Sequence, residues 1–286
     1  MPNSNAHGLQ LAAEIERNVV AALAEDIGPC DLSALLVPGG RRARGSVVTR
    51  QDGVLCGTAW FNATLRRLDA EAAINWSVKD GERFEAGQPL CHVQAETRAL
   101  LTGERSALNF LQLLSGTATT TRRFVDAVAG TAARIVDTRK TVPGLRQAQK
   151  YAVRCGGGGN HRFGLYDGIL IKENHIIAAG SIAAALAQAR ALASGDLFIQ
   201  VEVEDLGQLQ EALAAGARQI LLDNMDLTTM REAVAIAADR ATLEASGGVR
   251  LDTVRAIAET GVQRISIGCL TKDIAAVDLS LRHVEN

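Results

Sequence analysis

The second half of the chain alternates short β-rich runs with alanine-rich helical stretches, and this alternation restricts the folds it can adopt. The β-rich runs are ARIVDTRK, DGILIKENH, FIQVEVED, QILLDN, TLEASGG and RISIGC, and helical patterns such as LGQLQEALAAG separate the later ones. Such alternation predicts βαβ units and a parallel sheet. Six runs are fewer than the eight strands of a full barrel, which favours an incomplete parallel α/β barrel. A doubly wound open sheet is the alternative, because a sequence pattern does not show closure.

The first part of the chain has a different pattern, which predicts a separate small α+β domain. Apolar residues at Leu11, Ile15, Val19 and Leu23 fall four apart, so residues 9–24 are expected to form an amphipathic helix. Residues 44–94 show short β-like runs separated by Asp-Gly and Ala-Gly turns. A second helix is expected over residues 104–128.

Polar or charged residues follow each β-rich run of the second half. In chain order they are Arg139 and Lys140, Lys172 and Asn174, Glu202, Asp223, Ser246 to Gly248, and Gly268. Catalytic groups of α/β barrels lie at the C-terminal ends of the strands. The chain carries 30 Lys plus Arg against 32 Asp plus Glu, so these basic residues are local features of a near-neutral protein. This balance favours a small anionic substrate over nucleic acid, for which a basic surplus is expected.

Two glycine-rich segments are candidates for phosphate binding. Ser246, Gly247 and Gly248 end a strand before a helical pattern, where backbone N–H groups make an anion site, and Gly268 could complete it. A plain β-to-α turn is the alternative. The tetraglycine at 156–159 does not fit the G-x-x-x-x-G-K-[ST] pattern. We expect it to form a tight loop that places the residues after it, rather than to bind phosphate.

Three further residues have more than one chemical interpretation. Glu202 and Asp223 on neighbouring strand ends suit Mg²⁺ or sugar hydroxyls, although surface acids are the simpler reading. Lys172 could bind an anion or act as a Schiff-base nucleophile. The other cations nearby favour anion binding, because a single nucleophile does not need them.

The five cysteines are scattered and form no C-x-x-C pair. Free thiols in a reducing compartment are expected, and no Cys/His spacing typical of a zinc site is present. The N-terminal residues lack a basic region followed by an apolar run, and no apolar run approaches the roughly 18 residues of a membrane span. We therefore expect a cytoplasmic protein without membrane or nucleic-acid partners.

Three motifs closely resemble those of the quinolinate phosphoribosyltransferase family. They are DTRKTVPGLR at 137–146, GGGNHR at 157–162 and DGILIKENH at 167–175. The similarity extends upstream through ERSALN at 104–109 and EDIGPCDLS at 25–33, and downstream through VEVE, LLDN, SGG and ISIG. It covers almost the whole chain in order.

This resemblance implies an α/β fold with an N-terminal α/β-sandwich domain and an incomplete parallel α/β barrel. The sandwich would comprise residues 1–115, joined by the tail 273–286, and the barrel would comprise residues 116–272. The implied reaction joins quinolinate to the phosphoribosyl group of phosphoribosyl pyrophosphate, and releases CO₂ and pyrophosphate. The implied cofactor is Mg²⁺.

The resemblance also assigns roles to individual residues. Quinolinate would contact Arg139, His161, Arg162 and Lys172, with Thr138 in the same pocket and Arg105 supplied by the partner of a homodimer. The ribosyl pyrophosphate and Mg²⁺ would contact Lys140, Lys172, Glu202 and Asp223, and Glu202 and Asp223 would be the metal ligands. The 5-phosphate would bind at Ser246, Gly247, Gly248 and Gly268.

Three other functions compete with this one. The first is a related phosphoribosyltransferase with another acceptor, which the complete arginine set disfavours. The second is a lyase that forms a Schiff base through Lys172. The third is a non-catalytic carrier, because residues 79–97 resemble half of a lipoyl-carrier motif. When the sequence is laid on that motif, the position of the modified lysine falls on or next to Thr97. No lysine is present there, so no carrier arm can be attached and this function is disfavoured.

Overall fold

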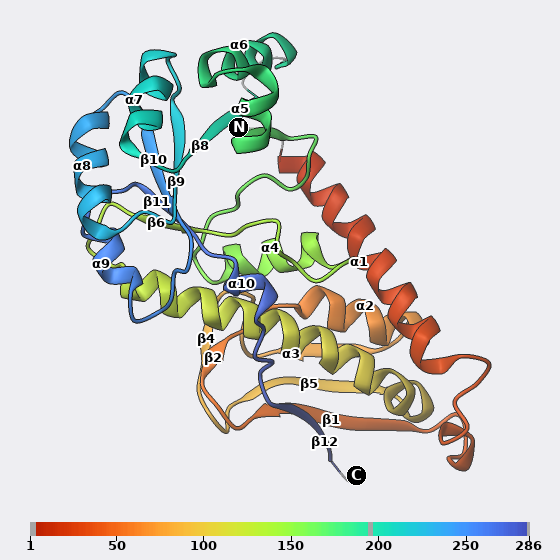
Figure 1. The fold of residues 1–286 in the computed structure, drawn as a ribbon. Coiled ribbons are helices and arrows are strands. Elements are labelled where there is room, and N and C mark those ends of the chain that lie inside the picture. The colour runs from red at the N-terminus through yellow and green to blue at the C-terminus, as the bar shows by residue number, and fades with distance from the viewer. Residues whose placement is uncertain (1–3, 194–196, 285–286) are drawn as a thin grey trace. The chain divides into compact units, whose positions relative to one another are not determined.

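The computed structural model describes residues 4–193 and 197–284, and the chain divides into two compact units (Figure 1). Unit 1 comprises residues up to 122, residues 141–157 and residues from 271 onward, whereas unit 2 comprises residues 123–140 and 158–270. The expected domain boundary at residues 115 and 116 falls inside helix α3 (Thr97–Ala127). That boundary stays a prediction.

Unit 1 contains a four-stranded sheet in the order β12-β1-β5-β3, and every neighbouring pair is antiparallel. The strands are β1 (Arg42–Thr49), β3 (Ala73–Trp76), β5 (Pro89–Glu96) and β12 (Leu279–Val284). Leu281, Val47 and Cys91 form one row across three of these strands, and all three are buried. The short strands β2 (Gly53–Val54) and β4 (Arg83–Phe84) pair with each other.

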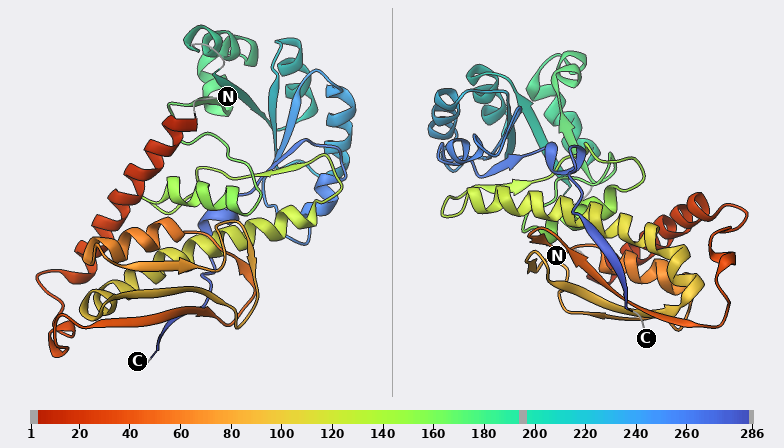
Figure 2. Two further views of the ribbon diagram at one scale, coloured as in Figure 1. Left: turned by 180° about the vertical axis from the view of Figure 1, so that it is seen from behind. Right: turned by 90° about the horizontal axis from the view of Figure 1, so that it is seen from below.

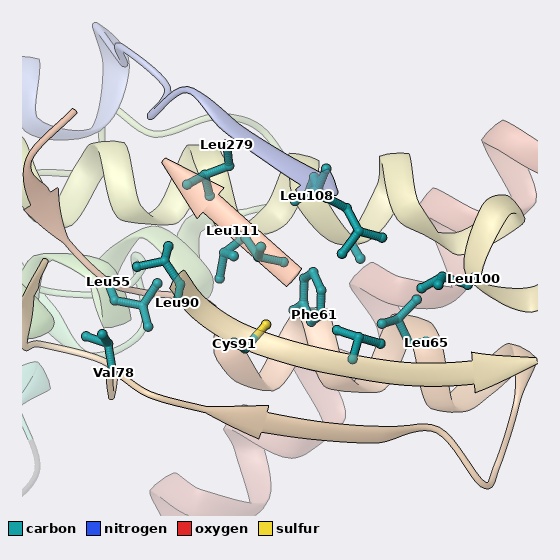
Figure 3. Close-up of a cluster of buried hydrophobic side chains, with 14 of the residues drawn as sticks. Leu55, Phe61, Leu65, Val78, Leu90, Cys91, Leu100, Leu108, Leu111 and Leu279 are labelled. Carbon is teal, nitrogen blue, oxygen red and sulfur yellow. The ribbon is translucent and has the colours of Figure 1, made fainter. Parts of the chain in front are cut away.

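Helices cover this sheet because their apolar faces match it. Unit 1 holds α1 (Ser4–Ile27), α2 (Thr58–Leu68), α4 (Arg146–Cys155) and most of α3. Phe61 of α2 and Leu108 and Leu111 of α3 meet Cys91 of β5 in one buried cluster (Figure 3). Full burial of a leucine side chain contributes about 1.5–3 kcal/mol, so this cluster is a main source of the stability of unit 1.

One helix of unit 1 was not predicted and one expected helix start was wrong, and each difference has a physical cause. The region expected to be β-rich contains helix α2, whose first N–H groups, those of Gly57 and Thr58, are capped by Asp80. That cap comes from 22–23 residues downstream, so no local start signal exists. Helix α3 begins at Thr97 rather than near 104, and the Glu96 carboxylate accepts a hydrogen bond from the Ala99 N–H in its first turn.

Unit 2 is built on a six-stranded sheet in the order β6-β11-β10-β9-β8-β7, and every neighbouring pair is parallel. This confirms each expected strand of the second half. The strands are β6 (Arg134–Val136), β7 (Gly168–Ile171), β8 (Phe198–Val203), β9 (Gln219–Asp223), β10 (Thr242–Ser246) and β11 (Arg264–Ser266).

The helices of unit 2 follow its strands. They are α5 (Glu173–Ala179), α6 (Ile182–Leu192), α7 (Leu206–Ala214), α8 (Leu227–Ala237) and α9 (Val254–Ala258). Helices α6, α7 and α8 contact strands of the sheet (Figure 2). Helix α10 (Cys269–Lys272) leads from unit 2 into the C-terminal segment of unit 1. Consecutive apolar residues such as Ile220 to Leu222 are buried, as expected for a parallel sheet covered on both faces.

The sheet of unit 2 forms an incomplete barrel. Its end strands β6 and β7 are joined by no regular ladder, and an irregular segment stands where a full barrel has further strands. In that segment Gly159 pairs with Val136 of β6 through one isolated bridge. Three residues later the Arg162 guanidinium donates to the carbonyl of Gly168 in β7, at 2.9 Å. The incomplete barrel is therefore confirmed.

Within residues 4–193 and 197–284, no single helix has the length and apolar composition needed to cross a membrane. One bent pair, α5 with α6, meets the length and composition test when the two helices are taken together.

Candidate active site

The candidate site residues of unit 2 are assembled at one edge of its parallel sheet. Because neighbouring parallel strands point the same way, their carboxyl ends meet at this edge. Along the strand order β6-β11-β10-β9-β8-β7, the residues at or just beyond the strand ends are Thr138 to Lys140, Gly268, Ser246 to Gly248, Asp223, Glu202 and Lys172. The register agrees, since Ser246 is opposite Asp223 and Ser266 is opposite Val136.

Two guanidinium groups, those of Arg139 and Arg162, bring positive charge to this part of unit 2. Arg162 is half-buried, and its Nη1 donates to the Gly168 carbonyl. Burial, together with the nearby charge of Arg139, lowers the pKa of Arg162. Two like charges that repel each other at a partly desolvated position are stabilised by an anion placed between them. Planar guanidinium groups favour carboxylate or phosphate for that anion.

The neighbours of His161 fix the orientation of its ring and the tautomer of its neutral form. Its Nδ1 accepts a hydrogen bond from the Arg162 backbone N–H at 2.8 Å. Its Nε2 lies 2.8 Å from Oε1 of Gln200, which is an acceptor, so the neutral ring carries its proton on Nε2. Both ring nitrogens therefore already hydrogen-bond to the protein, and the residue is 9% exposed. This geometry supports a role in positioning Arg162, and direct contact of His161 with a substrate stays a prediction.

A buried polar chain behind His161 was missing from the sequence analysis. Gln200 donates from Nε2 to Oε2 of Glu244 at 3.2 Å, and Glu244 forms an ion pair with Arg264 at 2.9 Å. Gln200 and Glu244 are fully buried. Each lies at a buried position within a strand, FIQVEV or TLEAS, that carries other polar residues as well, so the sequence offered only a weak signal.

Asp137 is a second functional residue that the sequence analysis did not select. It is fully buried immediately after β6. Its Oδ1 accepts from the His161 backbone N–H at 2.9 Å, and its Oδ2 accepts from the Asn160 side chain at 2.6 Å. Asp137 thus fixes the backbone from which His161 and Arg162 project.

The acidic side of the edge lies at β7, β8 and β9. Lys172 Nζ forms an ion pair with Oε2 of Glu202 at 2.7 Å. Asp223 accepts a hydrogen bond from the Asn224 side chain at 2.9 Å. Both carboxylates lie on neighbouring strands and retain free lone pairs, which suits Mg²⁺, an ion that binds to one or two protein carboxylates plus phosphate and water oxygens.

The glycine turn after β10 has the features of an anion-binding loop. Gly247 has φ +104°, and a Cβ on it would lie 2.1 Å from Oδ1 of Asn224, so a side chain is excluded there. Gly248 has φ +58° and faces open space within 4 Å of its Cβ position. Beside this turn, the Lys140 side chain runs past Gly268, with its Cδ 3.0 Å from where a Cβ would stand. A lysine and accessible backbone N–H groups thus meet at neighbouring strand ends, which is suitable for phosphate.

Arg105 is the one predicted site residue that belongs to unit 1. It is exposed on α3 and has no hydrogen bond or ion pair with any other residue in the described part of the chain.

Comparison with known proteins identifies similar sequences and folds. Residues 31–115 match the N-terminal domain, and residues 117–282 match the C-terminal domain, of quinolinate phosphoribosyl transferase. A probable nicotinate-nucleotide pyrophosphorylase (carboxylating) of Bacillus subtilis is 42% identical over 257 residues, which are 90% of this chain and 89% of the relative. The nicotinate-nucleotide pyrophosphorylase (carboxylating) of Mycobacterium leprae is 46% identical over 253 residues, 86% of this chain and 88% of the relative.

A solved structure shows the same fold. The nicotinate-nucleotide pyrophosphorylase of Francisella tularensis superposes with a TM-score of 0.93 at 42% sequence identity. The superposition covers 96% of this chain and 97% of that one.

Proposed function

The chain belongs to the quinolinate phosphoribosyltransferase family, and on this basis we propose that it transfers the phosphoribosyl group of phosphoribosyl pyrophosphate to quinolinate with decarboxylation. The products are nicotinate mononucleotide, pyrophosphate and CO₂, and the reaction is a step of NAD biosynthesis. The enzyme is a phosphoribosyltransferase.

The observation that carries this proposal is that Arg139 follows β6, that Arg162 donates to Gly168 of β7, and that the two guanidinium groups lie near enough for their charges to interact. Quinolinate has two adjacent carboxylates, and two guanidinium groups can bind both with charge-assisted hydrogen bonds. Each such bond contributes about 1.5–3 kcal/mol net. Nicotinate lacks the second carboxylate, so we expect it to be disfavoured by roughly ten- to a hundredfold.

The reaction explains the remaining residue types. The pyridine nitrogen attacks C1 of the ribose as pyrophosphate leaves, and Lys140 and Lys172 stabilise the leaving anion. The ring nitrogen then carries a positive charge, which stabilises the carbanion left when the 2-carboxylate departs as CO₂. We assign the 5-phosphate to the backbone of Ser246 to Gly248 and to Gly268.

We further propose that Glu202 and Asp223 hold Mg²⁺ together with oxygens of the pyrophosphate group. Bound Mg²⁺ would neutralise part of the charge that develops on the leaving group. Support comes from two carboxylates at neighbouring strand ends of one sheet. Removal of divalent ions by a chelator is expected to abolish the reaction, and added Mg²⁺ is expected to restore it.

The direct test supplies quinolinate, phosphoribosyl pyrophosphate and Mg²⁺ to the full chain. We expect CO₂ and nicotinate mononucleotide in equal amounts, with loss of both in Arg139→Ala. Nicotinate serves as the comparison substrate, and a kcat/KM similar to that for quinolinate would contradict the dicarboxylate assignment.

A homodimer in which Arg105 reaches the partner's active site is part of the proposal. The exposed position of Arg105 on α3 supports it. Mixing inactive Arg105→Ala protein with inactive Arg139→Ala protein should restore part of the activity, because heterodimers would contain one intact site. Failure of this recovery after demonstrated subunit exchange would count against a partner-supplied arginine.

The Schiff-base alternative is disfavoured by the contact of Lys172. Its Nζ is paired with the Glu202 carboxylate at 2.7 Å and is half exposed, whereas Schiff-base lysines lie in apolar pockets or beside another cation. Borohydride trapping with carbonyl substrates should therefore label no residue. The cytoplasmic location stays a prediction, which rests on sequence patterns and on five cysteines that form no disulfide.

A further inference from the structure

Three side chains with metal-binding chemistry meet in unit 1. Sγ of Cys56, a carboxylate oxygen of Asp80 and Sγ of Cys155 all lie within 4.8 Å of one another. Cys56 precedes helix α2, Asp80 lies in the turn between β3 and β4, and Cys155 ends helix α4. Across residues 4–193 and 197–284, this is the one grouping of three His, Cys, Asp or Glu side chains that is this compact.

The two thiols in the cluster are not equivalent. A hydrogen bond from the Cys56 thiol lowers the pKa of Cys155, and burial raises the pKa of Cys56 well above its ordinary value. Cys155 is half-buried and Cys56 is fully buried, so an ion would approach from the Cys155 side.

The Asp80 carboxylate is held in a fixed orientation. Its Oδ2 accepts from the Gly57 N–H at 3.2 Å and from the Tyr151 hydroxyl at 2.9 Å. Its Oδ1 accepts one hydrogen bond, from the Thr58 N–H at 3.2 Å. A carboxylate oxygen has two lone pairs, so one lone pair of Oδ1 remains for a further partner. Metal-binding carboxylates are commonly oriented by surrounding donors in this way.

The backbone of the cluster is clamped as well. The Ser115 hydroxyl accepts from the Cys56 N–H at 3.0 Å and donates to the Cys56 carbonyl at 3.1 Å. The Cys155 backbone packs against Gly81, whose Cβ position lies 3.4 Å from the Cys155 carbonyl oxygen. At the next residue, a Cβ on Gly156 would lie 2.5 Å from the Ala118 carbonyl, so the end of α4 is pressed onto α3. Neither cysteine can shift without moving α3 or its contacts.

We propose that Cys56, Asp80 and Cys155 bind one thiophilic divalent cation, with Zn²⁺ as the best match. Tetrahedral Zn²⁺ with Zn–S bonds of about 2.3 Å separates two sulfur ligands by about 3.8 Å, so sulfurs that already lie within 4.8 Å of each other need little movement. Arg154 beside the thiols offsets part of the negative charge of the ligand set.

The bound ion would tie the loop before α2, the turn holding Asp80 and the end of α4 together, with water as the expected fourth ligand. Its role is structural, and it is separate from the Mg²⁺ chemistry proposed for unit 2. Metal binding would displace the Cys56 proton, so its affinity should fall as the pH is lowered.

The test titrates Co²⁺ into the reduced, metal-stripped full chain. We expect near-ultraviolet thiolate-to-cobalt absorption that saturates at one equivalent and disappears when Zn²⁺ is added. Cys56→Ala and Cys155→Ala should abolish this absorption, and Asp80→Asn should weaken Co²⁺ binding at least tenfold. Zn²⁺ should also raise the melting temperature of the unsubstituted protein and leave that of Cys155→Ala unchanged.

Two control variants separate this site from other thiols and carboxylates. Cys91→Ala removes a buried thiol of the same unit that lies outside the cluster, and Glu202→Gln removes a carboxylate of the proposed Mg²⁺ site. Both should retain the full cobalt absorption, and circular dichroism of the metal-free variants checks that each is folded.

Three outcomes would overturn the proposal. The first is the absence of thiolate-to-cobalt absorption in the unsubstituted protein. The second is undiminished absorption in folded Cys56→Ala or Cys155→Ala. The third is a protein that binds no Co²⁺ but loses two thiols to a Cys56–Cys155 disulfide when treated with diamide, since that result identifies a redox pair instead of a metal site.

Discussion

Replacement of Gln200 by leucine tests whether the buried polar chain behind His161 holds the active site in place. Gln200 links two groups: its Oε1 accepts a hydrogen bond from His161 Nε2 at 2.8 Å, and its Nε2 donates to Glu244 at 3.2 Å. Leucine is of similar size but makes neither hydrogen bond. The variant therefore leaves the buried Nε2–H of His161 without its acceptor, whereas Glu244 Oε2 loses one donor and keeps its ion pair with Arg264.

The expected loss of stability follows from the imidazole N–H that loses its acceptor. A buried polar group without a partner costs about 1–3 kcal/mol. At about 2–4 °C per kcal/mol, the melting temperature of unit 2 should fall by roughly 2–12 °C. The freed imidazole can also turn away from the Arg162 N–H, so we expect KM for quinolinate to rise about tenfold, a loss of about 1.4 kcal/mol of binding.

Gln219→Leu provides the matched control. Gln219 lies on the neighbouring strand β9, and its Oε1 is buried without a hydrogen-bond partner, so the same substitution there removes an unsatisfied atom. We expect Gln219→Leu to be neutral or stabilising. Thermal melts and quinolinate titrations of the two variants give the comparison. Equal melting temperatures and unchanged KM in both would refute a positioning role for Gln200.

Three further outcomes are expected. Gly247→Ala should raise KM for phosphoribosyl pyrophosphate, because its Cβ would collide with Asn224. The control is Gly130→Ala, which also has a positive φ (+80°) but has open space around its Cβ position, and it should leave that KM unchanged. Backbone N–H donors lower the pKa of Asp69, so its stabilising effect is full above about pH 4, the unfolded value, and is lost as the pH falls through the folded value. In Asp69→Asn the free energy of unfolding should therefore fall less steeply as the pH is lowered from 5 to 2, as measured by denaturant titration at each pH. Leu111→Ala, at a fully buried position, should lower the free energy of unfolding of unit 1 by about 2–5 kcal/mol, measured in urea.

The fold of unit 2 could be predicted from the sequence because its signals are local. Each strand is a short apolar run followed by a polar residue, and parallel pairing brings those ends to one edge without further information. Helix α2 escaped prediction because Trp60 and Phe61 have strand propensity, and because its N-terminal cap is supplied by Asp80 from a distant turn. Tertiary contacts, rather than local sequence signals, therefore stabilise helix α2.

The candidate sites also differ in whether their residues could be recognised from local sequence patterns. The cations and carboxylates of the catalytic edge stand in recognisable motifs, so they could be selected from the sequence. Gln200 and Glu244 could not, since one polar residue in a strand does not reveal its partner. Cys56 and Cys155 lie about a hundred residues apart and lack the close ligand spacing that marks zinc sites in sequences. Only folding brings their sulfurs together.

Strand β12 has a consequence for the order in which the protein is made. This strand contributes residues 279–284 to the sheet of unit 1, whose other strands lie within residues 42–96. During synthesis the ribosome must therefore release almost the whole of unit 2 before the unit 1 sheet gains its edge strand. Until then β1 exposes an unpaired edge, a state prone to aggregation. Chains that stall before residue 279 should accordingly depend on chaperones for solubility, even though their catalytic edge is already complete.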